Sequence, residues 1–194
     1  MRVIAGEAKG QRLLAVPGTT TRPIADRVKE SLFNILGDRV VGATFLDLFA
    51  GTGGVGIEAL SRGAAAATFV ERDERAVQTI HANLKATGLL ARARVIRQDV
   101  FRFIATAADA VFDLVYVAPP QYRGLWAKTV EALDGCPLVS PGGLVIVQIF
   151  PKEYHPLSLT QLAPVDERKY GSTLLVFYAA ATGTAQDEAG QGAI

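Results

Sequence analysis

A glycine-rich turn with an acid just before it is the stretch of this sequence best suited to chemistry. Gly51, Gly53 and Gly56 have the spacing G-x-G-x-x-G and follow the apolar run 45–49. Glycine lets the backbone turn sharply and lets a ligand approach the main chain closely. Asp47 places a carboxylate where the pyrophosphate of a dinucleotide would approach, so it favours a cationic ligand instead. The simpler alternative is a tight strand-to-helix turn in which Asp47 only caps the helix.

Two further acids follow β-prone runs of the chain. Glu71 lies about twenty residues beyond the glycines, where an acid accepts hydrogen bonds from ribose hydroxyls. Asp99 ends the next run, and we predict that it meets an adenine amino group while Val100 covers the ring. A single acid at the end of a strand is a helix cap about as often as it is a ligand contact. Two acids together with the glycine turn predict S-adenosylmethionine as the ligand, and Asp47 argues against the alternative of a dinucleotide-dependent oxidoreductase.

A diproline turn follows the fourth apolar run, where the chain reads Ala118, Pro119, Pro120, Gln121 and Tyr122. Many amino methyltransferases carry Asp or Asn, two prolines and an aromatic residue there. The first side chain and a proline carbonyl hold an exocyclic amine, and the aromatic ring stacks on a flipped base. Ala118 has no acceptor, and the aromatic residue comes one position late. We predict that these five residues form the catalytic segment, with Pro119, Gln121 or Tyr122 partly replacing the acceptor. A diproline turn without a role is the alternative.

Strands and helices alternate along most of the chain and would bring these residues together. Segments with helical periodicity separate five β-prone runs, which are 45–50, 67–71, 94–99, 113–118 and 144–150. This pattern predicts an α/β fold with a doubly wound, mainly parallel sheet and helices on both faces, like the seven-stranded class I methyltransferase sheet. A final hairpin at 165–178 has no helix between its strands and predicts one antiparallel edge strand.

The predicted organisation has three parts. An N-terminal extension, 1–37, combines a hairpin formed by 2–5 and 11–16 with a helix at 24–36. The methyltransferase-like domain spans 38–181. Residues 182–194 are rich in Gly, Ala and Gln without periodicity, so we predict a disordered tail.

Composition and charge narrow the class of protein. The chain has 194 residues, 49% of them hydrophobic, and no apolar run of transmembrane length. Cys136 is the single cysteine, which excludes an internal disulfide and a cysteine metal cluster and fits a reducing cytoplasm. The net charge is +1, but the first thirty residues hold six basic against three acidic side chains. This basic arm favours an anionic macromolecule, with RNA contacts predicted at Arg2, Lys9 and Arg12; an ordinary solvated surface fits equally well.

Blocks along nearly the whole chain resemble RsmD-type ribosomal RNA methyltransferases. The blocks are 1–10 (MRVIAGEAKG), 21–30 (TRPIADRVKE), 32–36 (LFNIL), 47–53 (DLFAGTG), 56–64 (GIEALSRGA) and 169–171 (KYG). The resemblance implies methylation of the exocyclic N2 of a guanine in small-subunit (16S) ribosomal RNA, in assembled or assembling subunits, with S-adenosylmethionine as donor. It also implies that Arg22, Arg27 and Phe33 lie near the cofactor and the RNA.

The predicted site joins these residues to those of the glycine turn and the strand ends. The predicted cofactor contacts are Arg22, Arg27, Phe33, Asp47, Phe49, Ala50, Gly51, Thr52, Gly53, Gly56, Glu71, Arg72, Asp99 and Val100. We expect a cytoplasmic monomer without a metal or a membrane association. Because Ala118 and Gln121 depart from the family pattern, an inactive cofactor-binding RNA or assembly module is an alternative. A methyltransferase of another RNA amine or a protein amine is a second one.

Overall fold

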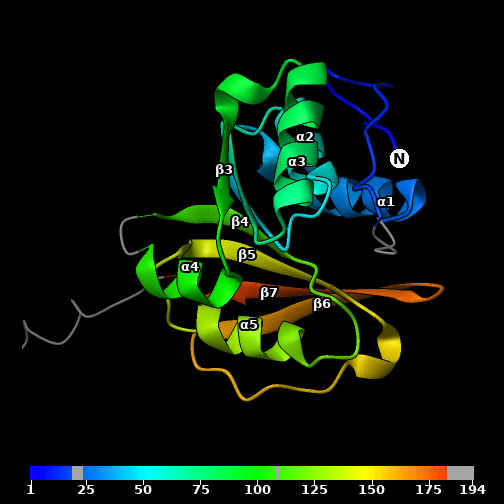
Figure 1. The fold of residues 1–194 in the computed structure, drawn as a ribbon. Helices are drawn as coiled ribbons and strands as arrows, with labels where there is room; N and C mark the ends of the chain where they lie inside the picture. Colours follow the sequence, from blue (N-terminus) through cyan, green and yellow to red (C-terminus); the bar gives the residue numbers. More distant parts are fainter. Residues whose placement is uncertain (19–23, 108–109, 183–194) are drawn as a thin grey trace, which may run out of the picture.

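A seven-stranded sheet organises the protein, which we describe from a computed structural model (Figure 1). The structure describes residues 1–18, 24–107 and 110–182. The strand order is β3-β2-β1-β4-β5-β7-β6. The strands are β1 (Thr44–Leu48), β2 (Ala66–Glu71), β3 (Ala93–Arg97), β4 (Phe112–Val117), β5 (Val139–Ile149), β6 (Leu162–Tyr170) and β7 (Thr173–Ala180). β1 to β5 run parallel, which confirms the predicted doubly wound sheet.

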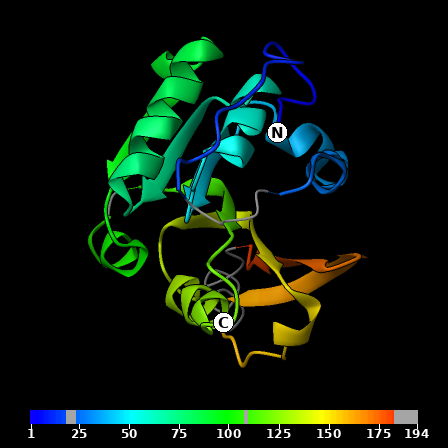
Figure 2. The same cartoon turned by 45° about the vertical axis from the view of Figure 1, so that its right-hand side comes forward.

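Helices cover both faces of the sheet, as Figures 1 and 2 show. The helices are α1 (Asp26–Leu36), α2 (Gly54–Ser61), α3 (Glu74–Ala86), α4 (Val100–Thr106) and α5 (Leu125–Leu133), with short 3-10 turns η1 (Gly37–Val40), η2 (Leu90–Arg92) and η3 (Pro151–Glu153). Side chains of a strand alternate between faces. Accordingly, Phe45 of β1 packs in one core with α1, α2 and α3, whereas Leu46 packs in a second core with α4 and α5. None of the helices in the described ranges is long and apolar enough to cross a membrane.

The antiparallel strand does not lie at the edge of the sheet, in contrast to the prediction. β7 lies between β5 and β6 and is antiparallel to both, so the edge belongs to β6. The two sequences explain this order. β7 buries an unbroken apolar run from Leu174 to Phe177, whereas β6 carries charged side chains from Asp166 to Lys169. Burial of the apolar strand between two others is favourable, and the charged strand takes the solvent-exposed edge.

Strand β5 starts earlier than the sequence predicts. It begins at Val139 and includes Pro141–Gly143, which precede the predicted run 144–150. The register of β4 and β5 is irregular beside Phe112 and Leu114, and β7 pairs with β5 along Leu144–Ile149. A proline has no N–H for a sheet ladder, but an irregular stretch without regular pairing tolerates it.

The N-terminal segment, residues 1–18, docks on α2 and α3 through buried side chains. The Glu58 carboxylate accepts the backbone N–H groups of Ile4 and Ala5 at 2.8 and 3.0 Å, and it lies 3.1 Å from the Lys29 ammonium. The Glu58 and Lys29 side chains are both fully buried. Asn83 of α3 holds Leu14 by accepting its N–H and donating to its carbonyl.

The predicted N-terminal hairpin is shorter than expected. One antiparallel bridge, between Arg2 and Arg12, forms outside the named strands of the described chain. The N–H groups of Ile4, Ala5 and Leu14 bond to side chains of the domain rather than to the opposite arm. The predicted disordered tail lies almost wholly in 183–194, outside the described residues.

Candidate active site

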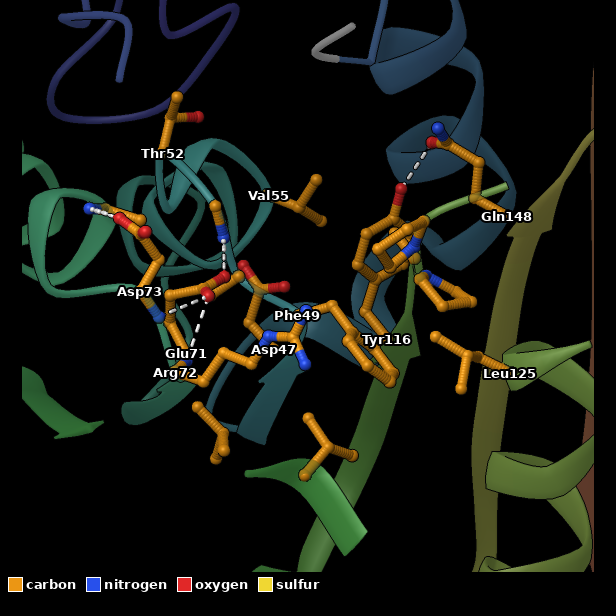
Figure 3. A pocket seen from close by; sticks show the side chains of 18 of the residues that line it. Asp47, Phe49, Thr52, Val55, Glu71, Arg72, Asp73, Tyr116, Leu125 and Gln148 are labelled. Atoms are coloured by element: carbon orange, nitrogen blue, oxygen red, sulfur yellow. Dashed lines mark hydrogen bonds between the residues drawn. The ribbon is translucent and has the colours of Figure 1, made fainter. Parts of the chain in front are cut away.

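A cavity of about 650 Å³ opens where the carboxyl ends of β1, β2 and β4 meet the start of α2 (Figure 3). In a doubly wound sheet, ligands bind at this edge. The cavity brings together many of the residues that the sequence predicts. They are Asp47, Phe49, Ala50, Gly51, Thr52, Glu71, Arg72, Asp99 and Val100 from the predicted cofactor site, and Ala118, Pro119, Pro120 and Gln121 from the predicted catalytic segment.

Asp47 forms the floor of the cavity and also holds the glycine turn. Its side chain is 2% exposed, and its Oδ2 accepts the Gly56 N–H at 3.0 Å. Burial raises the pKa of the Asp47 carboxyl to about 8; the Gly56 hydrogen bond opposes this, and the Glu71 charge adds to it. Asp47 therefore does bond to the first turn of α2, as the helix-cap alternative predicts. The same carboxyl also lines the cavity.

Glu71 and Asp99 likewise serve the backbone. The Glu71 carboxylate accepts N–H groups from Gly51, Arg72 and Asp73 at 2.8–3.0 Å. Asp99 caps α4 by accepting the N–H groups of the next turn. A carboxylate offers about four acceptor positions. Both acids therefore keep an acceptor position on the cavity wall, and contact of Glu71 with a ribose and of Asp99 with an adenine remains a prediction.

Two of the three motif glycines, Gly53 and Gly56, have a packing role, and their contact with the cofactor stays a prediction. Neither lines the cavity. A Cβ on Gly56 would lie 2.3 Å from the ring of Phe69, and one on Gly53 would lie 3.2 Å from Ile80. Gly53 also has a left-handed backbone, with φ +74°. The third glycine of this motif commonly allows close packing of helix on strand, and here Gly56 lets α2 approach β2.

Of the three residues placed near the cofactor by family resemblance, Arg27 and Phe33 do not line the cavity. Phe33 is 1% exposed in the core beneath α1, with the Arg62 guanidinium 5.0 Å above its ring. Phe33 therefore packs in the core with the apolar stripe of α1, and its predicted cofactor contact stays a prediction. Arg27 is exposed on α1 and does not line the cavity. Arg22 lies outside the described residues.

The segment after β4 forms a turn before α5, which starts at Leu125. Tyr122 has a left-handed backbone, with φ +58°, and its N–H donates to the Glu153 carboxylate at 2.6 Å. Its ring is 5.7 Å from the ring of Phe150, and the residue is 67% exposed. Tyr122 is therefore not part of the cavity wall, in contrast to Pro119 and Gln121.

Sequence reasoning missed several residues of the cavity wall. Tyr116 of β4 and Gln148 of β5 line it, and the Tyr116 hydroxyl donates a hydrogen bond to Gln148 Oε1. Figure 3 shows this pair across the cavity from Glu71 and Asp73. Gln148 is the one polar residue in the run 144–150, a signal that could have marked it. Met1 also lines the cavity, and only the tertiary fold brings it there.

Within residues 1–18, 24–107 and 110–182, no group of three or more His, Cys, Asp or Glu side chains is arranged to hold a metal ion. The polar side chains that line the described cavity are carboxylates, amides, guanidinium groups and hydroxyls.

Comparisons with known proteins identify the family. The family model described as "Conserved hypothetical protein 95" matches residues 1–179. The chain is 38% identical over 180 residues to the Bacillus subtilis protein named "Putative rRNA methyltransferase YlbH", covering 92% of this chain and 98% of that protein. It is 38% identical over 148 residues to "Ribosomal RNA small subunit methyltransferase D" of Escherichia coli K12, covering 76% and 74%.

A solved structure supports the same assignment. The structure of "Putative methyltransferase yhhF from Escherichia coli" superposes with a TM-score of 0.83 at 34% identity, over 94% of this chain and 98% of that one. The match includes the extension as well as the sheet, because it spans nearly the full length of both chains. The chain belongs to the family of RsmD-type methyltransferases.

Proposed function

We propose that this protein transfers a methyl group from S-adenosylmethionine to the exocyclic N2 amine of a guanine in small-subunit (16S) ribosomal RNA. The observation that carries the proposal is the single cavity wall shared by the Asp47–Gly51 turn and the segment 118–121. A donor site and an acceptor site that face the same space are what a direct methyl transfer requires. The names of the relatives supply the RNA substrate.

The donor half of the cavity fits S-adenosylmethionine. The ligand carries a sulfonium and an ammonium, and Asp47 offers a buried carboxyl whose ionised form a cation would stabilise. Glu71 holds Gly51 in the turn and keeps an acceptor position for a ribose hydroxyl. When bound, S-adenosylmethionine supplies an activated methyl group: the amine lone pair forms the C–N bond, the C–S electrons stay on sulfur, and water takes the proton.

The acceptor half is built from backbone and neutral side chains. Pro119 is buried and lines the cavity, and its carbonyl would accept one hydrogen bond from the amine. Gln121 adds an exposed amide on the same wall. Positioning of reactants contributes about 7–11 kcal/mol in favourable cases, whereas a general base adds about 10²–10⁴-fold. A site without a carboxylate at position 118 therefore retains most of the rate acceleration, because positioning supplies the larger part of it.

The RNA would reach the cavity along the N-terminal segment. Lys9 and Arg12 are exposed, and no ion pair of either is found among the described residues. Arg123 lines the cavity and is exposed at its mouth. Cations at these places would hold phosphates without reading sequence. The target nucleotide lies in a single-stranded or unstacked region, because the cavity admits a base only out of its stack.

Ala118 favours one competing function, a cofactor-binding module that binds RNA without methylating it. The two functions differ in one assay. The protein is incubated with methyl-labelled S-adenosylmethionine and small-subunit RNA, both free and in partly assembled subunits, and the nucleosides are then analysed. Labelled N2-methylguanosine supports the proposal. Binding of RNA and cofactor without label in any nucleoside contradicts it and supports the module, and label in another nucleoside or in protein corrects the substrate.

A further inference from the structure

The cavity contains a pair of side chains that the proposed function leaves without a role. Tyr116 of β4 and Gln148 of β5 both line it, and the Tyr116 hydroxyl donates to Gln148 Oε1 (Figure 3). Tyr116 is 2% exposed, whereas Gln148 is half-buried. A buried phenol thus holds an amide that stands at the boundary between the core and the space for the substrate.

The register of the sheet sets Gln148 beside Ala118. Tyr116 pairs with Ile146 and Val117 with Val147, so the next residues in this register are Ala118, just past the end of β4, and Gln148. Because side chains alternate between faces, Ala118 and Gln148 are on the same face of the sheet as Tyr116. Neighbouring strands lie about 4.8 Å apart. A glutamine side chain spans that distance, and its amide therefore reaches the space that a longer side chain at position 118 would fill.

The tyrosine fixes which groups the amide presents. Burial raises the pKa of the Tyr116 hydroxyl well above its ordinary value, and the Asp47 charge adds to this, so the hydroxyl stays protonated and donates. Gln148 Oε1 keeps one acceptor position, and Nε2 keeps its two donors. No other hydrogen bond of the Gln148 side chain is found in the described part of the chain. Such an amide is complementary to an amino group beside an unprotonated ring nitrogen, as N2 and N3 are in guanine.

We propose that Gln148, oriented by Tyr116, accepts a hydrogen bond from the target amine and so replaces the acceptor that Ala118 lacks. The inference rests on the proposed function, because it concerns the amine that the reaction methylates. Gln148 then touches the substrate, and Tyr116 is a positioning residue that acts through it.

Two single variants test the pair in single-turnover methylation of small-subunit RNA. Gln148→Met keeps the length of the side chain and removes the amide, and we expect a rate lower by about tenfold to a hundredfold, since up to two hydrogen bonds are lost. Tyr116→Phe removes only the orienting hydroxyl, and we expect a loss of about threefold to tenfold. Calorimetric affinity for S-adenosylhomocysteine and the melting temperature should stay near wild type. Gln161→Met, at the exposed residue just before β6, is the matched control and should not slow the reaction.

A restored acceptor separates substrate contact from packing. Ala118→Asn in the Gln148→Met background should recover most of the rate, and in the Tyr116→Phe background it should do the same. If Gln148→Met is as fast as wild type, or if Ala118→Asn recovers nothing, the inference is wrong while the proposed function stands. If wild type transfers no methyl group to any small-subunit RNA, the proposed function fails, and with it the claim that the pair is a working acceptor.

Discussion

Asp47 is a buried carboxyl whose state depends on what occupies the cavity. The unliganded protein keeps it protonated up to a pH of about 8, because burial disfavours the charge. The unfolded chain loses the same proton near pH 4. Between about pH 4 and 8 the folded state therefore binds a proton that the unfolded state releases, and the free energy of unfolding falls as pH rises, by up to about 1.4 kcal/mol per pH unit.

Asp47→Asn should remove this pH dependence. The asparagine can still accept the Gly56 N–H, so the turn is kept. A cationic ligand favours the ionised carboxyl, so in wild type the affinity for S-adenosylmethionine should rise by up to about tenfold per pH unit from pH 6 to 8. In Asp47→Asn the affinity should be lower and nearly flat. Calorimetry across this range measures both, and equal slopes for the two proteins would show that Asp47 does not ionise on binding.

Tyr122→Ala tests the one predicted catalytic residue that the cavity wall does not include. The ring is exposed beside Phe150, at a place where a flipped base could stack on it. Loss of base stacking is worth about 1–3 kcal/mol, so single-turnover methylation should slow by about fivefold to a hundredfold. Gln121→Ala, which removes one neutral hydrogen bond, should cost about tenfold at most. If Tyr122→Ala is as fast as wild type, the ring only packs on Phe150.

The sequence could predict those residues of the candidate site that lie at the ends of strands. Asp47, Glu71, Asp99 and the diproline follow from the rule that parallel strand ends meet at one edge. Which glycine touches a ligand and which packs on Phe69 depends on the tilt of α2, and the sequence pattern carries no information on that. The position of Phe33 in the core could not be predicted either, because burial in a core and burial against a cofactor select the same apolar residues.

At the scale of elements, the N-terminal segment is the feature whose attachment matters most. It reaches the cavity through Met1, and it is held by the Glu58–Lys29 pair and by Asn83. Replacing a buried pair is often neutral, but removing one partner leaves the other charge unpaired. Periodicity predicted α1 and the sheet, since these are local patterns. It could not predict the docking, which depends on polar side chains of α2 and α3 far along the chain.

Two glycines of this segment form a matched pair for testing the docking. Gly6 and Gly10 have nearly the same left-handed backbone, with φ +82° and +84°. A Cβ on Gly6 would lie 1.8 Å from the Ser61 carbonyl oxygen, whereas one on Gly10 meets nothing within 4 Å. Gly10→Ala should cost about 1 kcal/mol of stability from backbone strain. Gly6→Ala should cost more and also weaken S-adenosylhomocysteine binding. Thermal melts and calorimetry compare them, and equal losses would show that close docking at Ser61 adds nothing.

The whole molecule has almost no net charge, so RNA binding must depend on where its cations lie. Figures 1 and 2 show the N-terminal segment beside α1, α2 and α3, on the face of the sheet away from α5. Lys9 and Arg12 are exposed there. Arg2, the third predicted RNA contact, lies 3.5 Å from Asp26 and is partly neutralised by it. The sequence gives the charges, but their distribution over faces is a property of the fold.

Lys9→Ala/Arg12→Ala should weaken RNA binding and flatten its salt dependence. If each side chain neutralises one phosphate, the slope of log affinity against log salt should become less steep by about 1.4 to 1.8. Affinity for S-adenosylhomocysteine should not change. Lys128→Ala/Lys169→Ala, on α5 and β6, makes the same change in charge elsewhere and is the control. Equal slopes for the two double variants would mean that the RNA does not follow the N-terminal segment.

The composition of β6 also bears on how the protein behaves at high concentration. An open strand at the border of a sheet can template pairing with another chain, which leads to aggregation. Here the border strand carries Pro164, an irregularity beside Asp166, and four consecutive charged residues up to Lys169. Proline interrupts the row of free N–H groups, and charges repel a like strand. The last strand pair thus closes the sheet with a surface that disfavours growth by strand addition, while the apolar β7 stays hidden behind it.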